Sequence, residues 1–310
     1  MTDAPSSSTC VLLARAHGAQ LAGTAPVATG WVLVEQPGPW GRSALTESGL
    51  DPTIGAALEA AAGDGVRVQV IRRPGLGNGS RFVTPRTVVL AHTGPSPWAE
   101  QLELTSDTDL ARLDPNLTLA PTPPGLGLRV EQPLWLVCTH GRRDRCCATY
   151  GRPIVDALVA LHGDAVWEVS HVGGHRFAGN LVALPDGTVY GALQVAEALR
   201  VLDLHRAGRH DLAHLRGRSH LPRAAQAAEV LARTELEVDR RDAVTVSAAG
   251  APGTDGAIAV DLDVEGRTYV ATVRQVPTGA SYAQSCDRGE PEDPGRWHLT
   301  ALQPAPFGDR

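Results

Sequence analysis

The stretch LWLVCTHGRRDRCC at residues 134–147 decides how this sequence is interpreted. It begins with five apolar residues, a run typical of a strand buried on both faces, and continues into a polar segment that contains cysteines. Apolar residues at helical spacing follow at 153–161, and a second buried strand follows at 165–169. The segment therefore predicts a strand, a helix and a strand, with the cysteines placed just after the first strand.

The next elements extend this unit. Short strands at 181–184 and 188–190 flank Pro185-Asp186-Gly187, and an Asp-Gly pair is typical of a tight hairpin turn. A further helix is expected at 194–204. The order strand–helix–strand–strand–strand–helix predicts a thioredoxin-like domain over residues 126–205, in which a mixed sheet is flanked by helices.

Residues 1–125 repeat the same kind of alternation and predict a related α/β N-terminal domain. Its expected strands lie at 11–14, 30–35, 66–71 and 87–91, and its expected helix lies at 54–61. Residues 119–126 contain three prolines and a glycine, so we expect the linker between the two domains there.

Residues 206–310 form a smaller C-terminal region whose role the sequence leaves open. A helix is expected at 224–234, before strands at 243–247, 258–262, 268–276 and 297–302. The segment 289–295 is rich in proline and acidic residues, which indicates a loop.

Composition excludes several classes of protein. The 310 residues are 43% hydrophobic and 20% charged, as in globular proteins, and the net charge of −6 argues against a nucleic-acid partner. No stretch approaches the roughly 20 apolar residues of a membrane span. Residues 1–5 lack positive charge and the apolar run 11–14 is short, so we expect no secretory signal and a cytoplasmic location.

The five cysteines point to metal binding or catalysis rather than to disulfides, because the cytoplasm keeps thiols reduced. Cys138 and Cys147 follow the strand at 134–137, and His171 and His175 follow the next strand. If these strands are neighbours, two thiolates and two imidazoles can converge on one site. Thiolates suit zinc and iron–sulfur clusters, imidazoles suit zinc and iron, and two histidines replace two cysteines on one iron of Rieske [2Fe–2S] centres.

The neighbours of these residues leave alternatives open. Cys146 is adjacent to Cys147, and since adjacent side chains of a strand point to opposite faces, we expect only one of the two to reach the metal. Cys10 and Cys286 show no partner pattern and are expected to be packing residues. His140, Arg143 and Asp144 are expected to support the site rather than to bind, and an Arg143–Asp144 ion pair is a further alternative.

The combined motif resembles the sucrase/ferredoxin-like family, whose members are thioredoxin-like ferredoxins. The resemblance implies a [2Fe–2S] cluster held by Cys138, Cys147, His171 and His175, with Cys147 favoured over Cys146. It is close over residues 134–191 and loose over the first two-thirds of the chain. The residues that resemble the family are Cys138-x-His140-x-x-Arg143-Asp144-x-x-Cys147, His171-x-x-x-His175, Ala178-Gly179-Asn180, Gly23-Thr24-Ala25, Trp31, Glu35 and Pro37–Gly41.

The resemblance implies an electron carrier rather than an enzyme with a substrate of its own, and a redox protein as its partner. Arginines crowd the same loops and favour an acidic partner: Arg142, Arg143, Arg145, Arg152 and Arg176. Three alternatives remain: a structural zinc protein using the same four ligands, a thiol redox protein using the vicinal cysteines, and a glycoside hydrolase, for which no acid pair can be placed. The sequence does not determine the oligomeric state.

Overall fold

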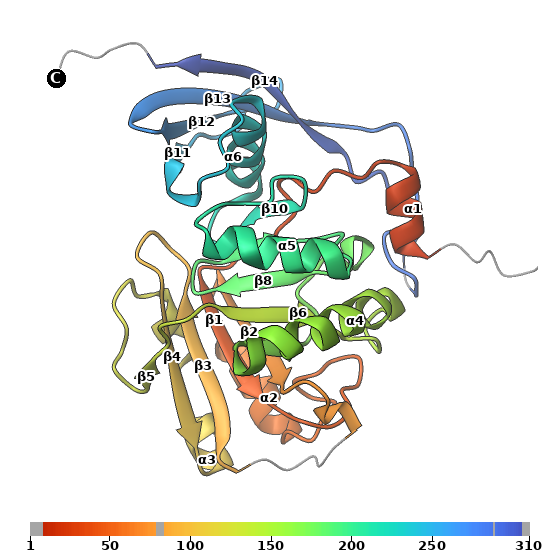
Figure 1. Cartoon of the computed structure of the whole chain (residues 1–310), viewed down its shortest axis with the longest axis vertical. Coiled ribbons are helices and arrows are strands. Elements are labelled where there is room, and N and C mark those ends of the chain that lie inside the picture. Colours follow the sequence, from red (N-terminus) through yellow and green to blue (C-terminus); the bar gives the residue numbers. More distant parts are fainter. Residues whose placement is uncertain (1–8, 79–83, 288, 306–310) are drawn as a thin grey trace, which may run out of the picture.

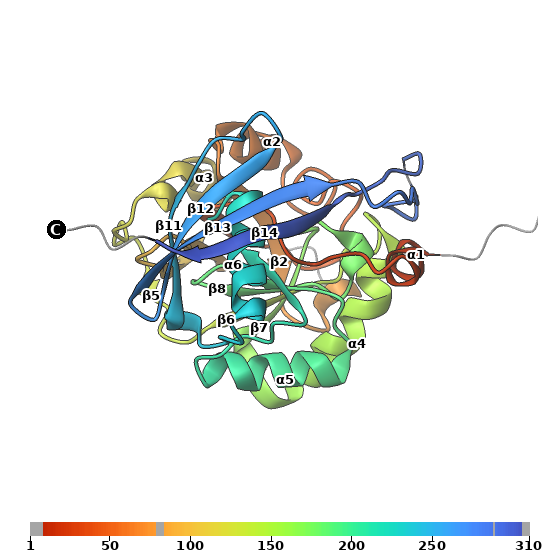
Figure 2. The same cartoon turned by 90° about the horizontal axis from the view of Figure 1, so that it is seen from above.

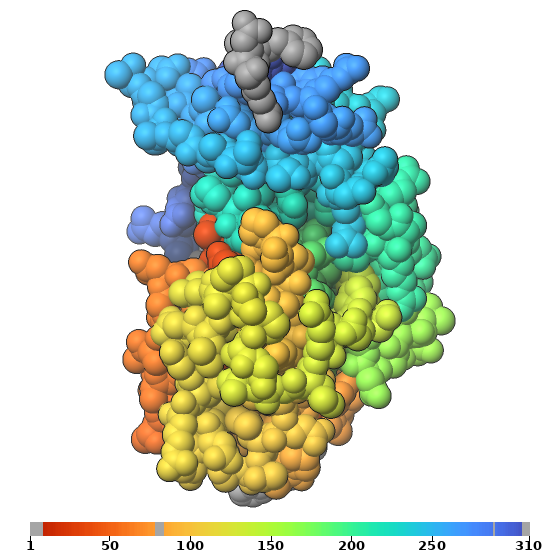
Figure 3. Space-filling model, turned by 90° about the vertical axis from the view of Figure 1, so that its left-hand side faces the viewer, coloured from red at the N-terminus to blue at the C-terminus, as the bar shows by residue number. Residues whose placement is uncertain are grey.

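Strand β6 (Leu134–Cys138) lies inside a ten-stranded mixed sheet, the main feature of the computed structural model, which describes residues 9–78, 84–287 and 289–305 (Figure 1). Helices flank this sheet, and a separate four-stranded antiparallel sheet lies at one end of the molecule (Figures 1 and 3). The expected mixed α/β class is confirmed. The prediction of no secretory signal rests in part on residues 1–5, which lie outside the described residues.

The large sheet has the strand order β10-β9-β8-β6-β7-β2-β1-β3-β4-β5. Strand β6 pairs in parallel with β7, and β7 pairs antiparallel with β2, which joins the strands of residues 30–129 to those of 134–218. The domain boundaries expected at 125 and 205 stay predictions. Besides β6, the strands are β1 (Gly30–Glu35), β2 (Val66–Arg72), β3 (Arg86–His92), β4 (Trp98–Leu104), β5 (Leu128–Arg129), β7 (Val166–Val169), β8 (Leu181–Leu184), β9 (Thr188–Tyr190) and β10 (Leu215–Arg218).

The order β6-α4-β7-β8-β9-α5 is the expected thioredoxin-like order. Helices α4 and α5 pack on one face of its strands, where Trp135 and Val137 of β6 contact apolar side chains of both helices. Helices α2 and α3 cover the outer face of the N-terminal strands. The α-helices are α1 (Cys10–Ala16), α2 (Pro52–Ala61), α3 (Asp107–Ala111), α4 (Arg145–His162), α5 (Val195–Arg206) and α6 (Arg223–Glu235), and the 3₁₀ helices are η1 (Leu76–Asn78), η2 (Pro115–Leu119), η3 (Gly163–Ala165), η4 (His175–Phe177) and η5 (Arg241–Ala243).

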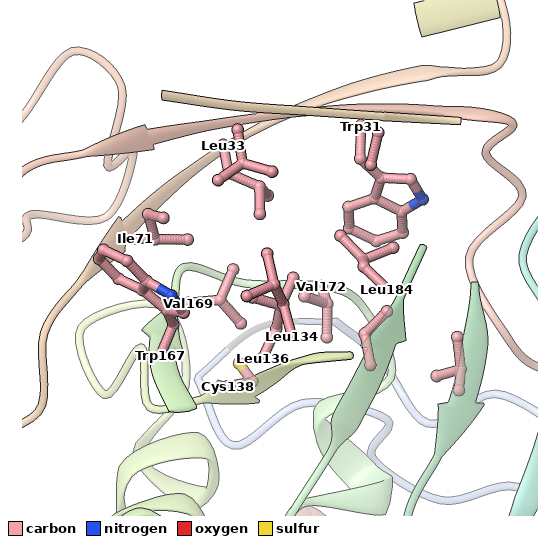
Figure 4. Packing of buried hydrophobic residues seen from close by; sticks show 14 of the residues in the cluster. Trp31, Leu33, Ile71, Leu134, Leu136, Cys138, Trp167, Val169, Val172 and Leu184 are labelled. Atoms are coloured by element: carbon pink, nitrogen blue, oxygen red, sulfur yellow. The ribbon is translucent and has the colours of Figure 1, made fainter. Parts of the chain in front are cut away.

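The inner faces of the two halves of the sheet share one apolar core. Trp31 and Leu33 of β1 lie in the same buried cluster as Leu134 and Leu136 of β6 (Figure 4). Cys138, the last residue of β6, belongs to this cluster, so it is anchored in the buried core of the large sheet.

The C-terminal strands form the small sheet, which packs on α6 (Figure 2). Its order is β11-β12-β13-β14, all antiparallel, with β11 at Val244–Ala249, β12 at Ala257–Val264, β13 at Arg267–Val276 and β14 at Arg296–Pro304. The segment 277–295 joins β13 to β14, and its described residues, 277–287 and 289–295, run back toward α1, as both views of the ribbon show (Figures 1 and 2).

Two of the expected elements differ from the structure. Residues 11–14, predicted as a strand, lie in α1, because the hydroxyl of Thr9 accepts a hydrogen bond from the Leu12 N–H and so caps a helix. Helix α4 begins at Arg145, eight residues before the predicted start, because Asp144 caps it and Pro153 is accommodated inside it. No helix of the described residues has both the length and the apolarity needed to cross a bilayer.

A buried ion cluster connects α6 to both sheets. The carboxylate of Glu229 lies 3.0 Å from the guanidinium of Arg233 and 2.9 Å from that of Arg218 in β10. The Arg233 guanidinium, fully buried, also donates to the carbonyl of Val244 at the start of β11. Burial alone would raise the pKa of Glu229, but Arg218 and Arg233 outweigh it and lower that pKa from 4.5 to about 2.

We expect Glu229→Gln to lower the free energy of unfolding at pH 7 by about 3–5 kcal/mol, because it leaves a buried guanidinium without its counter-charge. A lowered carboxyl pKa stabilises the fold above the unfolded-state pKa, and this contribution disappears as pH falls from about 5 toward 2. Urea unfolding from pH 7 to pH 3 should therefore show a steeper acid loss in the wild type than in the variant. The control is exposed Glu235→Gln in the same helix; an equal loss in both variants would contradict the account.

Candidate metal centre

Parallel pairing of β6 and β7 brings the cysteine and histidine loops together. Cys138 ends β6 directly opposite Val169, the last residue of β7. The loops that follow the two strands therefore begin side by side, at the same end of the strands. The N–H of Cys138 donates to the carbonyl of Asn180 at 3.0 Å, so β8 also fixes the position of this cysteine.

Helix α4 places the second cysteine. Asp144 caps the helix by accepting a hydrogen bond from the N–H of Cys146, and Cys146 and Cys147 occupy its first turn. Gly151, one turn further along, lies against β6, where a Cβ atom would come within 2.2 Å of the Cys138 carbonyl oxygen. A side chain at Gly151 would push α4 away and separate the two cysteines.

Consecutive residues of a helix point about 100° apart, so the two adjacent thiols face different surroundings. The prediction that the two side chains point to opposite faces of a strand is therefore wrong, because Cys146 and Cys147 lie in a helix. Cys147 lies beside Cys138 and His171, whereas Cys146 faces Cys10 of α1 and Cys286 of the 277–295 segment.

Three of the four ligands expected from the sequence lie together. One donor atom each of Cys138, Cys147 and His171 lies within 4.8 Å of the other two, and the Cys147 Sγ is 3.8 Å from the His171 Nδ1. A hydrogen bond from the Cys147 thiol holds the pKa of Cys138 well below its usual value, and the same contact raises the pKa of Cys147. The pair thus already favours a thiolate, the form that binds metals.

His175 lies next to this trio but outside it. Its ring centroid is 5.0 Å from that of His171. The Nδ1 atom of His175 is buried and has no hydrogen-bond partner among the described residues, while its Nε2 lies 3.9 Å from the Asp144 carboxylate. Burial lowers the pKa of His175, which favours the neutral imidazole that a metal requires.

The residues expected to support the site have defined positions. Both nitrogens of His140 are engaged: Nε2 lies 2.6 Å from the carbonyl of Gly41, and Nδ1 accepts the N–H of His171 at 3.2 Å. His140 therefore orients the His171 loop and is not free to bind a metal. Arg143 is exposed, while the buried carboxylate of Asp144 accepts the N–H groups of Cys146 and Cys286. These hydrogen bonds outweigh burial and lower the pKa of Asp144.

Arg216 of β10, which sequence reasoning missed, supports the histidine loop. Its guanidinium is 1% exposed and donates to the carbonyl of Gly173 at 3.1 Å and to the Asn180 amide oxygen at 2.8 Å. It also bonds to Thr24. Gly174 has a φ of +73°, and a Cβ there would lie 2.4 Å from Arg216, so the loop needs glycine at this position.

The expected arginine rim is mostly exposed, as Arg142, Arg143, Arg145 and Arg152 lie at the surface, whereas Arg176 is half-buried against Phe177. A cavity of about 220 Å³ opens beside half-buried His171. Its lining includes two arginines that sequence reasoning missed, Arg42 and Arg67, together with Arg143.

The structure also shows a second group of potential ligands. The sulfur atoms of Cys10, Cys146 and Cys286 gather around Asp144. Cys10 and Cys286, expected to be packing residues, each lie within 3.6 Å of the Cys146 sulfur, a contact that the sequence did not indicate. No local spacing links residues so far apart in the chain.

Fold and site together define a mixed α/β protein with a cysteine–histidine group able to hold a metal. Residues 21–217 match the family model described as sucrase/ferredoxin-like, so the chain belongs to this family, which suggests a ferredoxin-like role. No curated protein and no solved structure shows a significant match to the chain.

Proposed function

We propose that this protein transfers electrons through a [2Fe–2S] cluster held by Cys138, Cys147, His171 and His175. The observation that supports this most is the Nδ1 of His175, which has no hydrogen-bond partner within the part of the chain that the structure describes. This buried atom lies on the loop that also places the Nδ1 of His171 beside the Cys147 thiol. A buried nitrogen without a partner is costly, and a metal bond would satisfy it. The family match supports the same interpretation.

Charge fits this cofactor. Two Fe³⁺, two sulfides and two thiolates sum to zero, so a cluster with two neutral imidazoles is formally neutral. Cys138 and Cys147 are 1% and 0% exposed, and a neutral cluster can be buried there without a compensating charge. The Asp144 carboxylate, 3.9 Å from the His175 Nε2, is the kind of outer partner that orients a ligating histidine.

When bound, the cluster supplies one-electron chemistry. The chain buries both cysteines and leaves His171 half-exposed beside the cavity lined by Arg42, Arg67 and Arg143. We therefore propose this side as the docking site of an acidic redox protein, since complementary charge steers such encounters. A reducing cytoplasm, the proposed location, keeps all five thiols free.

Two alternatives are less well supported. A vicinal-dithiol redox centre needs Cys146 and Cys147 to face one another, but their sulfurs contact different partners in two separate groups. A structural zinc ion on the same four ligands would form a closed site. It would give no role to the half-exposed side of His171 or to the arginines beside it.

Visible absorption of anaerobically purified full-length protein tests the proposal. We expect a red-brown protein whose colour bleaches on addition of dithionite, because only the iron–sulfur form absorbs in this range. A colourless protein from iron-replete cells would contradict the proposed function and favour zinc or thiol chemistry.

A further inference from the structure

We propose that Cys10, Asp144, Cys146 and Cys286 form a second metal site, which binds one zinc ion and fastens helix α1 and the segment between β13 and β14 to helix α4. This site is separate from the proposed cluster, and the inference does not depend on the proposed function. Cys10 begins α1, Asp144 and Cys146 begin α4, and Cys286 lies in the segment between β13 and β14.

The distances between donor atoms fit a single tetrahedral ion. The Cys10–Cys146, Cys146–Cys286 and Cys286–Cys10 sulfur pairs are 3.6, 3.3 and 3.5 Å apart. The Asp144 oxygens lie 3.7 and 3.8 Å from the Cys10 sulfur. A tetrahedron with Zn–S bonds of about 2.3 Å has sulfur–sulfur edges of about 3.8 Å, so the three sulfurs would move apart by about 0.2–0.5 Å to hold the ion.

Packing alone does not explain this group. Cys10 and Cys146 are 1% exposed and Asp144 is 0% exposed, so a carboxylate lies buried among three sulfurs. A buried charge is costly unless a cation or sufficient hydrogen bonds offset it. The cations nearby are peripheral: Arg145 is exposed, and the His175 Nε2 is 3.9 Å from Asp144. Hydrogen bonds already offset the Asp144 charge, so the unexplained feature is the gathering of three thiols around it; with zinc, three thiolates and this carboxylate the site would carry a net charge of −2 beside Arg145 and His175.

Asp144 can be a ligand and a helix cap at the same time. Its Oδ2 accepts hydrogen bonds from the Ser285 hydroxyl and the Cys286 N–H, and its Oδ1 accepts one from the Cys146 N–H. The Cys10 thiol also donates to Oδ1 at 3.7 Å, but it loses this proton when it binds zinc as a thiolate. Oδ1 therefore keeps a lone pair for the metal. Three thiolates and one carboxylate make a closed four-coordinate shell, which is typical of structural zinc, and binding releases the thiol protons to solvent.

The site also explains how the 277–295 segment is held. This connection is longer than most loops of compact proteins, and loops of such length usually need a specific function or anchor. Cys286 ties it to α1 and α4, since the Cys10 N–H also donates to the Cys286 sulfur at 3.4 Å. Zinc would thus join residues 10, 146 and 286, which are far apart in sequence.

Zinc and iron analysis of full-length protein, purified anaerobically from cells supplied with both metals and dialysed against EDTA, tests this site. We expect one zinc per chain in the wild type. In Cys10→Ser and Cys286→Ser the zinc content should fall about tenfold or more, while iron is retained. Retained iron shows that these variants fold. Cys286→Ser keeps the backbone N–H that holds Asp144, so the proposed cluster ligands should stay in place.

Two controls separate this site from the proposed cluster. Cys138→Ser should lose iron and keep zinc, and Cys147→Ser, one residue from Cys146, should do the same. A wild type without zinc, a disulfide among Cys10, Cys146 and Cys286 found by mass spectrometry, or zinc that disappears with Cys138 and not with Cys286 would each overturn the proposal. Absence of iron with zinc present would contradict only the proposed electron-transfer function.

Discussion

Cys147→Ser is expected to abolish the visible spectrum and to remove essentially all iron, while Cys146→Ser retains both. The reason is the first turn of α4, which points the Cys147 thiol toward Cys138 and His171 and the Cys146 thiol toward Cys10 and Cys286. A serine oxygen is a poor substitute for a thiolate at an iron–sulfur cluster. Absorption spectra and iron analysis of the two variants, prepared side by side, measure the difference.

The pair is a matched control, because the two changes are chemically identical and lie one residue apart. Cys146→Ser should lose zinc if the second site is correct, but its iron content should stay close to that of the wild type. Loss of the visible spectrum in Cys146→Ser, with retention in Cys147→Ser, would move the ligand by one residue and contradict the assignment.

Arg216→Met is the second change with a large expected effect. The guanidinium makes hydrogen bonds to Gly173, Asn180 and Thr24, and methionine fills similar space without donors. Each hydrogen bond to a charged group contributes about 1.5–3 kcal/mol, so we expect the free energy of unfolding to fall by about 3 kcal/mol or more. The histidine loop loses its support, and affinity for iron should fall about 10- to 100-fold, as for other outer-sphere changes.

Urea unfolding and retention of iron against a chelator measure both effects. Arg206→Met, an exposed arginine in α5, should change neither quantity. Zinc content should stay at the wild-type level in Arg216→Met. The hydrogen-bond partners of this guanidinium are Thr24, Gly173 and Asn180, and none of them is a ligand of the second site. Wild-type iron retention in Arg216→Met would show that the loop is positioned by other contacts.

Local patterns predicted most of the fold. The strands at 134–138 and 166–169 and the hairpin around Asp186-Gly187 were readable because alternation, apolar runs and turn residues act over short distances. The convergence of the cysteine and histidine loops followed from one assumption, that β6 and β7 are neighbours, and their parallel pairing confirms it. The start of α4 was missed because the apolar residues at helical spacing begin only at 153, whereas Asp144 caps the helix earlier.

Long-range placement could not be predicted in the same way. Arg216 is 43 residues from the Gly173 carbonyl that it binds, and Cys10 is 276 residues from Cys286. Neither separation produces a periodicity or a spacing that a single sequence displays. The pairing of β7 with β2, which joins both halves into one sheet, could not be predicted either. The sequence of β7 would allow it to pair with any strand edge that has a suitable hydrophobic pattern.

The central claim is that Cys138, Cys147, His171 and His175 hold a [2Fe–2S] cluster. The most direct test is the iron and acid-labile sulfide content of the full-length protein, purified anaerobically from iron-replete cells. The account predicts two iron and two sulfide per chain, together with one zinc from the separate site. Two zinc per chain with neither iron nor sulfide would contradict it, because zinc would then occupy the cysteine–histidine site as well.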